Sequence, residues 1–442
     1  MERYNEYKDS GVQWLGEIPS HWEVVRLKSV IKDSQSGVWG EDPKHDGSDT
    51  LCLRVADFNY NNGYLKEDNL TYRNYGKELS SNKQLQMRDL LLEKSGGGDL
   101  YPVGRVVRYN FNGIVATCSN FIQKLTPRDN VDSDFIYYLF RTMYYLKVNG
   151  LYYNQTTGIQ NLKVKEYLSQ TVFLPPLSEQ QAIANYLDTA TAKIDEAIAQ
   201  QQKMIDLLNE RKQIIINNAV TKGLNPDAPM KDSGVDWIGE IPEHWIITKL
   251  KHLVEITDGT HDTPRYVDPS SNTYPLVTSR CIVNGVIDLS LANHITEQDY
   301  NYIATRSYVR RNDVIMPMIG TVGNPAIVDF EDSIAIKNVA LFRTNGDINI
   351  AKFLKYLLNS TVVKEQFAMY NKGGVQNFVS QEILKNLAII VPDNITDIVG
   401  FLEREIAKIE TPIIAHNRQI SLLQERKQII INDVVTGKVK VS

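Results

Sequence analysis

Two short charged clusters contain residue types that could do chemistry. The stretches Glu210-Arg211-Lys212 and Glu425-Arg426-Lys427 have the acid-x-lysine order that ends a nuclease motif. Both fall in stretches with a helical pattern, and neither has the paired acid upstream on a strand that a nuclease needs. We therefore interpret them as solvated or subunit-facing charge clusters, and we expect them to bind a partner protein.

Other features that could suggest catalysis lack the partners that their chemistry requires. His21 and His244 each precede a Trp, but no nucleophile or metal ligand accompanies them, so we expect packed side chains at a domain edge. The run Gly96-Gly97-Gly98 is not followed by Lys-Ser or Lys-Thr, so we interpret it as a strained turn or a close backbone approach to a ligand, not as a nucleotide P-loop. The cysteines are scattered without metal-ligand spacing. We expect no catalytic residue, metal or cofactor in this chain.

The charged clusters belong to a repeated helical segment. The stretch Leu207–Thr221 returns almost unchanged as Leu422–Thr436, 215 positions later, which indicates an internal duplication. Apolar residues recur there at spacings of three, four or seven, which predicts two long helices with one apolar stripe each. A helix of about 65 Å with such a stripe needs a partner, and we expect its own copy to serve as one. The alternative is two ordinary core helices. Pro412 is expected to kink or interrupt the second helix.

A second repeat opens each half of the chain. The stretch Lys8–Trp22 is similar to Lys231–Trp245, and a strand-rich region with turn residues follows each copy. We expect a mixed α/β protein with two β-rich α+β domains. The predicted boundaries are 1–176 for the first domain with its irregular N-terminal segment, 177–223 for the first helix, 224–230 for a linker, 231–392 for the second domain, 393–437 for the second helix and 438–442 for a tail.

Composition narrows the class of protein. The chain has 442 residues and a formal net charge of −5, which argues weakly against general nucleic-acid binding but leaves room for a local basic face. Residues 80–128 contain seven basic and three acidic residues, a local net charge of +4. No apolar run reaches the length of a membrane span and the start has no apolar signal region, so we expect a cytoplasmic protein that does not bind membranes.

The sequence resembles the specificity subunits of type I restriction–modification systems. The resemblance covers nearly the whole chain and is carried by Asp9–Trp22, Gly158–Leu162, Leu174–Gln180, Asp258–Pro264 and the Glu-Arg-Lys-Gln helix ends. It implies two target-recognition domains, each binding one half of a split double-stranded DNA site, separated by an antiparallel pair of long helices with a pseudo-two-fold internal repeat. It also implies two methyltransferase subunits that use S-adenosylmethionine, two restriction (translocase) subunits that use ATP and Mg²⁺, and no catalysis in the specificity subunit.

Polar residues on predicted loops are the candidates for DNA contact, because such side chains bond base edges and phosphates. A second interpretation stays open for the Gln-Asn pairs at 160–161 and 376–377, which recur in both halves and could cap the following helix instead. A solitary two-headed DNA-binding or regulatory protein without enzymatic partners is the alternative function. The DNA-binding candidates are Ser95, Arg105, Thr157, Gln160, Asn161, Thr260, His261, Lys372, Gln376 and Asn377.

Overall fold

The computed structural model describes residues 2–12, 14–76, 79–156, 158–320, 322–370 and 378–441. The chain divides into two compact units, Met1–Lys203 with His416–Ser442 (unit 1) and Met204–Ala415 (unit 2). The long helices α3 (Leu177–Lys222) and α8 (Ile395–Val435) each contribute one part to both units. The two predicted long helices are therefore present, and each unit also holds one strand-rich domain.

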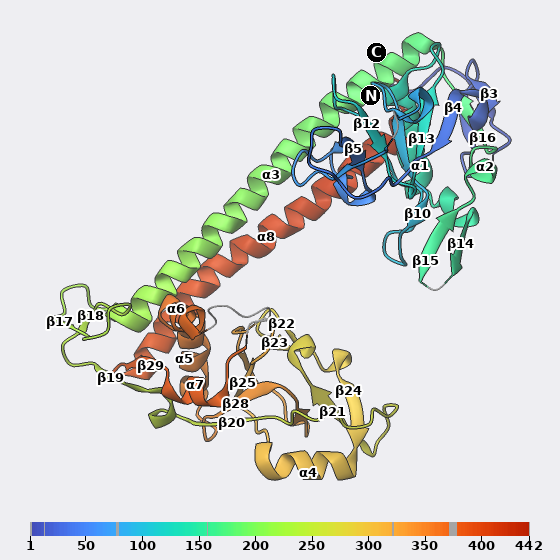
Figure 1. Cartoon of the computed structure of the whole chain (residues 1–442). Coiled ribbons are helices and arrows are strands. Elements are labelled where there is room, and N and C mark those ends of the chain that lie inside the picture. Colours follow the sequence, from blue (N-terminus) through green and yellow to red (C-terminus); the bar gives the residue numbers. More distant parts are fainter. Residues whose placement is uncertain are drawn as a thin grey trace. The chain divides into compact units, whose positions relative to one another are not determined.

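The domain of unit 1 is built on a four-stranded antiparallel sheet. Its strands are β4 (Ile31–Ser36), β9 (Leu90–Glu93), β11 (Val106–Arg108) and β13 (Ile122–Pro127), in the order β11-β9-β13-β4. A smaller sheet places β5 (Thr50–Leu53) parallel to β12 (Ala116–Cys118) and antiparallel to β8 (Tyr72–Arg73). The helix α1 (Ser133–Tyr145), which begins at the capping side chain of Asp132, packs its buried face into the same core as Leu90 and Leu125 (Figure 1).

The domain of unit 2 repeats this topology. The strands β20 (Glu255–Asp258), β25 (Val314–Pro317), β26 (Ala326–Ile327) and β28 (Val339–Arg343) pair in the order β20-β28-β25-β26. The strand β21 (Thr273–Val277) lies parallel to β27 (Ala335–Ile336) and antiparallel to β24 (Asn293–Thr296). The sequences of the two domains are related only by a sparse pattern, so the common sheet order shows that the duplication includes the domains.

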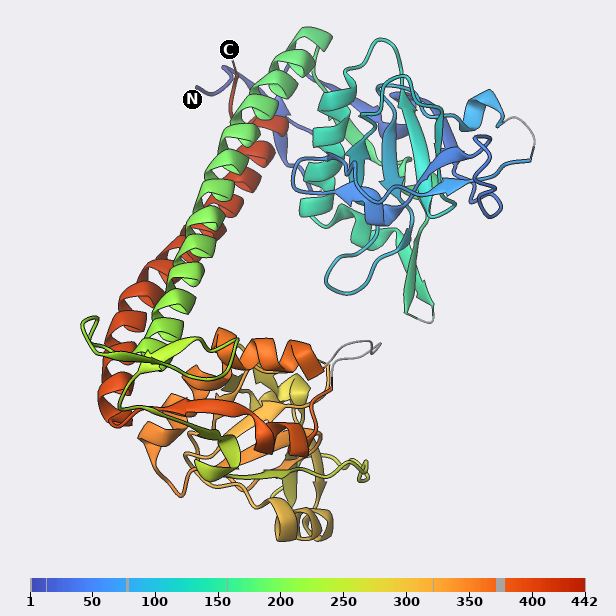
Figure 2. The same ribbon diagram turned by 60° about the vertical axis from the view of Figure 1, so that its left-hand side comes forward.

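The helices of unit 2 differ in part from the prediction. Two short helices, α5 (Ile348–Leu358) and α6 (Thr361–Tyr370), follow the strands. Figures 1 and 2 show both beside the ends of α3 and α8 in unit 2, where they share one core with Val220 and Leu402. The helix α4 (Glu297–Ser307) was not predicted, because its buried residues, Tyr300, Ile303 and Ser307, are too few to give a clear apolar stripe.

The long helices run antiparallel in each unit. In unit 1, Leu187 near the start of α3 shares a core with Ile431 near the end of α8. Gln201 Oε1 lies 2.6 Å from Nδ1 of His416, which is the same position in the other copy of the repeat. The expected interruption at Pro412 is wrong: α8 is helical through this residue. Proline removes only one N–H from the helical ladder, so the neighbouring bonds and the packing of α8 keep the helix continuous.

Each irregular opening segment caps the end of a long helix. Gly437, with φ of +74°, ends α8 against Trp22, and Gly223, with φ of +77°, ends α3 against Trp245. Glu2 pairs with Lys440 across an antiparallel bridge, so the first residues lie beside the last ones within unit 1. His21 Nε2 contacts Glu179 Oε1 at 2.6 Å, and 45% of its side chain is exposed, so it is less packed than expected. In the part of the chain that the structure describes, no helix is both long and apolar enough to cross a bilayer.

Candidate nucleic-acid interface

The structure brings two of the candidate DNA-binding residues of the first domain together. Ser95 on β10 (Ser95–Gly96) is in register with Asn161 on β15 (Ile159–Leu162), and Ser95 Oγ donates to Asn161 Oδ1 at 2.8 Å. The stretch predicted as a polar loop is instead a hairpin of β14 (Tyr153–Thr156) and β15. The polar residues of this hairpin therefore lie on paired β-strands and not on a loop. Thr157 lies outside the described residues.

Gln160 is buried and is not at the surface. Its side chain is 1% exposed, Oε1 accepts from the Val103 backbone N–H at 3.2 Å, and Nε2 donates to Gln155 Oε1 at 3.3 Å. The alternative of helix capping is also wrong for Gln160 and Asn161, because the following helix α2 (Val164–Tyr167) has Lys163 at its N-cap without a side-chain hydrogen bond. The equivalent residues Gln376 and Asn377, and Lys372 with them, lie outside the described residues.

Arg105 is held inside the first domain by an ion pair. Its Nε and Nη2 donate to the two carboxylate oxygens of the buried Glu93 at 2.8 and 3.1 Å, and its guanidinium stacks 3.8 Å from the ring centroid of Tyr60. Burial raises the pKa of Glu93, although the hydrogen bonds from Arg105 oppose that shift. Two nitrogens of Arg105 are thus bonded to Glu93 and are not available to contact DNA.

Arg105 also lines a cleft that the sequence did not reveal. The cleft has a volume of about 880 Å³ and contains the side chains of several tyrosines together with Arg141 and Lys147. Arg141 Nη1 donates to the Tyr137 hydroxyl at 3.1 Å. Aromatic rings beside cationic groups suit nucleic-acid bases and phosphates. The tyrosines are at positions 60, 101, 137, 144, 145 and 153, so the fold brings two distant residues to a group of four that lie close in the sequence.

In the second domain, Thr260 and His261 follow β20 and belong to one polar cluster. His261 lies with Nε2 3.0 Å from Asp258 Oδ2 and with Nδ1 2.9 Å from Asn338 Oδ1, while half of its side chain stays exposed. Arg306 on α4 forms an ion pair with the other oxygen of Asp258. Thr260 is held by backbone bonds to Ile336 and Asn338. Arg306 and Asn338 were missed, since only the fold brings them to this loop.

The loop after β20 approaches its neighbouring strand very closely. A Cβ at Gly259 would lie 2.2 Å from the backbone oxygen of Ile336, and a Cβ at Gly37, after β4, would lie 2.2 Å from that of Cys118. These glycines occupy equivalent places in the two domains. Both scaffolds therefore present the loop after the same edge strand in the same way, with different side chains on it.

The predicted partner-binding clusters are only partly at the surface. Glu210, Arg211, Glu425 and Arg426 are exposed, as expected for a docking surface. Lys427 is not: its Nζ contacts Asp195 at 2.6 and 2.7 Å and donates to the Asn61 backbone oxygen at 2.7 Å.

The expectation that Lys427 binds a partner is therefore wrong, because the side chain is consumed by an ion pair between α8 and α3. Its repeat copy, Lys212, pairs with Glu410 at 2.6 Å and remains about one third exposed. Exposed apolar residues accompany each cluster at a spacing of seven, Leu207 and Ile214 on α3 and Leu422 and Ile429 on α8. Each cluster thus combines charged and apolar surface.

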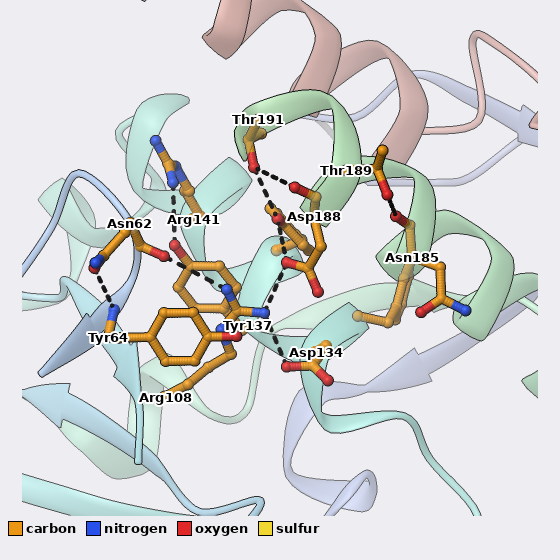
Figure 3. A network of polar contacts seen from close by, with 12 residues as sticks. Asn62, Tyr64, Arg108, Asp134, Tyr137, Arg141, Asn185, Asp188, Thr189 and Thr191 are labelled. Atoms are coloured by element: carbon orange, nitrogen blue, oxygen red, sulfur yellow. Dashed lines mark hydrogen bonds and ion pairs between the residues drawn. The ribbon is translucent and has the colours of Figure 1, made fainter. Parts of the chain in front are cut away.

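A buried arginine links the first domain to α3. Arg108 at the end of β11 donates through Nη1 to Asp134 Oδ1 and to Asp188 Oδ1, both at 2.9 Å (Figure 3). Burial alone would lower the pKa of Arg108, but the charge of Asp188 and the neighbouring tyrosines outweigh it and raise that pKa. The guanidinium is therefore a permanent charge at this junction.

Among the described residues, no group of three or more His, Cys, Asp or Glu side chains is arranged to hold a metal ion.

Comparisons with known proteins identify the family. Residues 19–205 and 242–428 each match the model of the "Type I restriction modification DNA specificity domain". The chain is 26% identical over 456 residues to the type I restriction enzyme MjaVIII specificity subunit of Methanocaldococcus jannaschii, with 100% of this chain and 98% of the relative covered. It is 27% identical over 226 residues to the type I restriction enzyme EcoBI specificity subunit of Escherichia coli, with 50% and 47% covered.

A solved structure shares the fold. The structure described as "Structural basis underlying complex assembly and conformational transition of the type I R-M system" is similar with a TM-score of 0.65 at 15% identity, over 96% of this chain and 99% of that chain. The family matches span most of the chain and fall on both halves of the internal repeat. The chain therefore belongs to the type I restriction–modification DNA specificity domain family and carries two copies of that domain.

Proposed function

We propose that this chain is the DNA specificity subunit of a type I restriction–modification complex, in which each domain recognises one half of a bipartite site in double-stranded DNA. The observation that carries this proposal is the pairing of one duplicated scaffold with two different surfaces. The sheet order is the same in both domains, whereas the loop after the equivalent edge strand carries Trp39 in the first domain and His261 in the second, both exposed. A chain with two different recognition surfaces is suited to bind two different half-sites.

The long helices act as the spacer between the half-sites. The ion pairs Lys427–Asp195 and Lys212–Glu410 join equivalent positions of the repeat, one pair in each unit. Apolar stripes supply the area of contact and these pairs favour one register. Half-sites one to two turns of DNA apart, at about 34 Å per turn, match helices of this length.

The partner subunits supply the chemistry. Two copies of one exposed surface, Leu207-Arg211-Ile214 and Leu422-Arg426-Ile429, fit two copies of one partner, because residues four and seven apart lie on one helix face. These partners are two methyltransferase subunits that bind S-adenosylmethionine, joined by two restriction (translocase) subunits that use ATP and Mg²⁺. The chain itself is acidic, so phosphate charge is neutralised by local basic surface and by the partners.

A domain exchange tests this function. Residues 23–170 are replaced by the matching segment of another family member, and the chain is produced with its methyltransferase in a host without the system. Sequencing of methylated bases is expected to show one altered half-site and one unchanged half-site. A change in both halves, or methylation that does not depend on this chain, would contradict the proposal.

Charge reversal separates the proposal from a solitary DNA-binding regulator. Arg211→Glu and Arg426→Glu alter exposed residues, so the chain should still fold and should lose one methyltransferase copy for each substitution. Size-exclusion chromatography with light scattering measures the stoichiometry. An unchanged complex would contradict docking at these surfaces and would favour the regulator.

A further inference from the structure

We infer that Arg108 is a positioning residue that fixes the angle between the first domain and α3, and thereby the length of spacer that the complex accepts between its two half-sites. This inference rests on the proposed function. It concerns the junction of the domain with the helix, which has no direct contact with DNA in the proposed arrangement.

One guanidinium joins three elements of unit 1. Arg108 comes from β11, Asp134 from α1 and Asp188 from α3, and both carboxylates accept from the same Nη1 (Figure 3). The guanidinium lies over the rings of Tyr64 and Tyr137, with centroid distances of 4.0 and 4.4 Å. Only 7% of the Arg108 side chain is exposed, and its Nη1 is held by both carboxylates, whereas its buried Nε has no hydrogen-bond partner among the described residues.

Asp188 receives a second bond from the domain. The Tyr138 hydroxyl of α1 donates to Asp188 Oδ1 at 2.8 Å, and Thr191, one turn further along α3, lies 3.4 Å from the same hydroxyl. The oxygen that holds Arg108 therefore also holds α1. Charge-assisted hydrogen bonds are directional and short, so this arrangement tolerates little rotation of the domain about α3.

The apolar part of the junction cannot impose an angle by itself. Ile183 and Leu187 of α3 are fully buried in the domain core. Apolar burial is non-directional and depends on area, so it holds the helix against the domain without choosing one orientation. The polar network that begins at the next residue, Asp188, adds directional bonds to these apolar contacts. Further along α3, Lys427 adds a second polar link by bridging Asp195 and the Asn61 backbone oxygen.

A small change of angle is enough to change the spacer. A domain of about 150 residues has a radius of about 15 Å. A shift of one base pair is about 3.4 Å along DNA. At that radius the shift corresponds to a rotation of about 13°, which is within the freedom of a helix held by apolar contacts alone.

The repeat supplies a counterpart with weaker burial. Glu403 is the copy of Asp188 and pairs with Lys352 of α5 at 2.6 Å. The Glu403 and Lys352 side chains are 45% and 31% exposed, and the cation comes from a helix and not from the sheet. The same carboxylate position thus anchors both domains. Because Arg108 is buried, the orientation of the first domain on its helix is more tightly constrained than that of the second domain.

The test uses Arg108→Met in the full chain with its methyltransferase partner. Methionine keeps the apolar volume, and Asp134 and Asp188 are 42% and 39% exposed, so water can solvate them. Removing one partner of a buried ion pair is destabilising, so the Tm of this variant is measured alongside its methylation pattern. Asp188→Asn is the second variant, and Asp129→Asn, in an exposed pair with Lys32, is the matched control.

Sequencing of methylated bases gives the distribution of spacer lengths. Wild type and Asp129→Asn should methylate one spacer length. Arg108→Met and Asp188→Asn should keep both half-site sequences and methylate sites with one base pair more or less about tenfold more than wild type does, which corresponds to about 1.4 kcal/mol.

An unchanged spacer distribution in Asp188→Asn, or altered bases in a half-site, would overturn the inference. If Arg108→Met does not fold, Asp188→Asn decides alone. A wild type without any bipartite methylated motif would refute the proposed function instead.

Discussion

Lys427→Met should destabilise unit 1 far more than the equivalent Lys212→Met destabilises unit 2. The two lysines occupy the same position of the repeat, but their surroundings differ. Lys427 is 7% exposed and contacts both oxygens of Asp195 and one backbone oxygen, whereas Lys212 is 30% exposed and contacts one oxygen of Glu410. Burial lowers the pKa of Lys427, although the ion pair with Asp195 opposes that shift.

The magnitude follows from these contacts. Loss of one partner of a buried charged hydrogen bond destabilises by about 1.5–3 kcal/mol, whereas an exposed pair contributes about 0–1 kcal/mol. Asp195 is 35% exposed and regains water in the variant, so we expect about 2 kcal/mol for Lys427→Met and less than about 1 kcal/mol for Lys212→Met. For a unit of about 200 residues, 2 kcal/mol lowers the Tm by about 4–8 °C.

Differential scanning calorimetry of the isolated chain is the assay, because the two units can melt as separate transitions. The first substitution should lower one transition and the second should leave both nearly unchanged. Equal shifts, or a larger shift for Lys212→Met, would refute the assignment of Lys427 to the interior. Loss of methyltransferase binding without any thermal shift would restore its role as a partner contact.

Three further predictions concern the scaffold. Gly259→Ala should destabilise unit 2 by more than about 2 kcal/mol in urea denaturation, since its Cβ would lie 2.2 Å from the Ile336 oxygen. Gly98→Ala is the control, because a Cβ there would meet no atom within 4 Å. Equal effects of the two substitutions would contradict the close approach at Gly259. Burial raises the pKa of Asp89 above its ordinary 3.8, so its destabilising charge is present at neutral pH and is lost as the pH falls through the raised pKa. The stability of wild type relative to Asp89→Asn should therefore rise on acidification in urea titrations at several pH values, and a constant difference would contradict that sign. A circular permutant can join the termini by a short linker and open the chain within 224–229. Because Glu2 pairs with Lys440, this permutant should keep its Tm and its methylated motif. An unfolded permutant would contradict that pairing.

The internal repeat and the two long helices could be predicted from the sequence. The apolar period and the repeat indicated both long helices, which the structure contains. It could not predict that Lys427 is buried and Lys212 is not, because the two helices are nearly identical there. The difference comes from the Asn61 backbone oxygen, which the first domain places beside Lys427.

The candidate DNA-binding residues were harder to predict. The hairpin of β14 and β15 was taken for a loop because Asn, Gln and Thr are weak strand signals, and pairing with β10 decides its conformation. Gln160 and Arg105 looked available in sequence, but their partners Val103 and Glu93 fix them within the domain. Such partners are set by tertiary structure and leave no local pattern.

The most direct test of the account is the sequencing of methylated bases in a host that carries this chain with its methyltransferase. If the chain is a DNA specificity subunit, the methylated bases should lie in a single asymmetric motif with two specified half-sites and an unspecified spacer of constant length. Methylation at an uninterrupted motif, or the same motif when the chain is omitted, would contradict it.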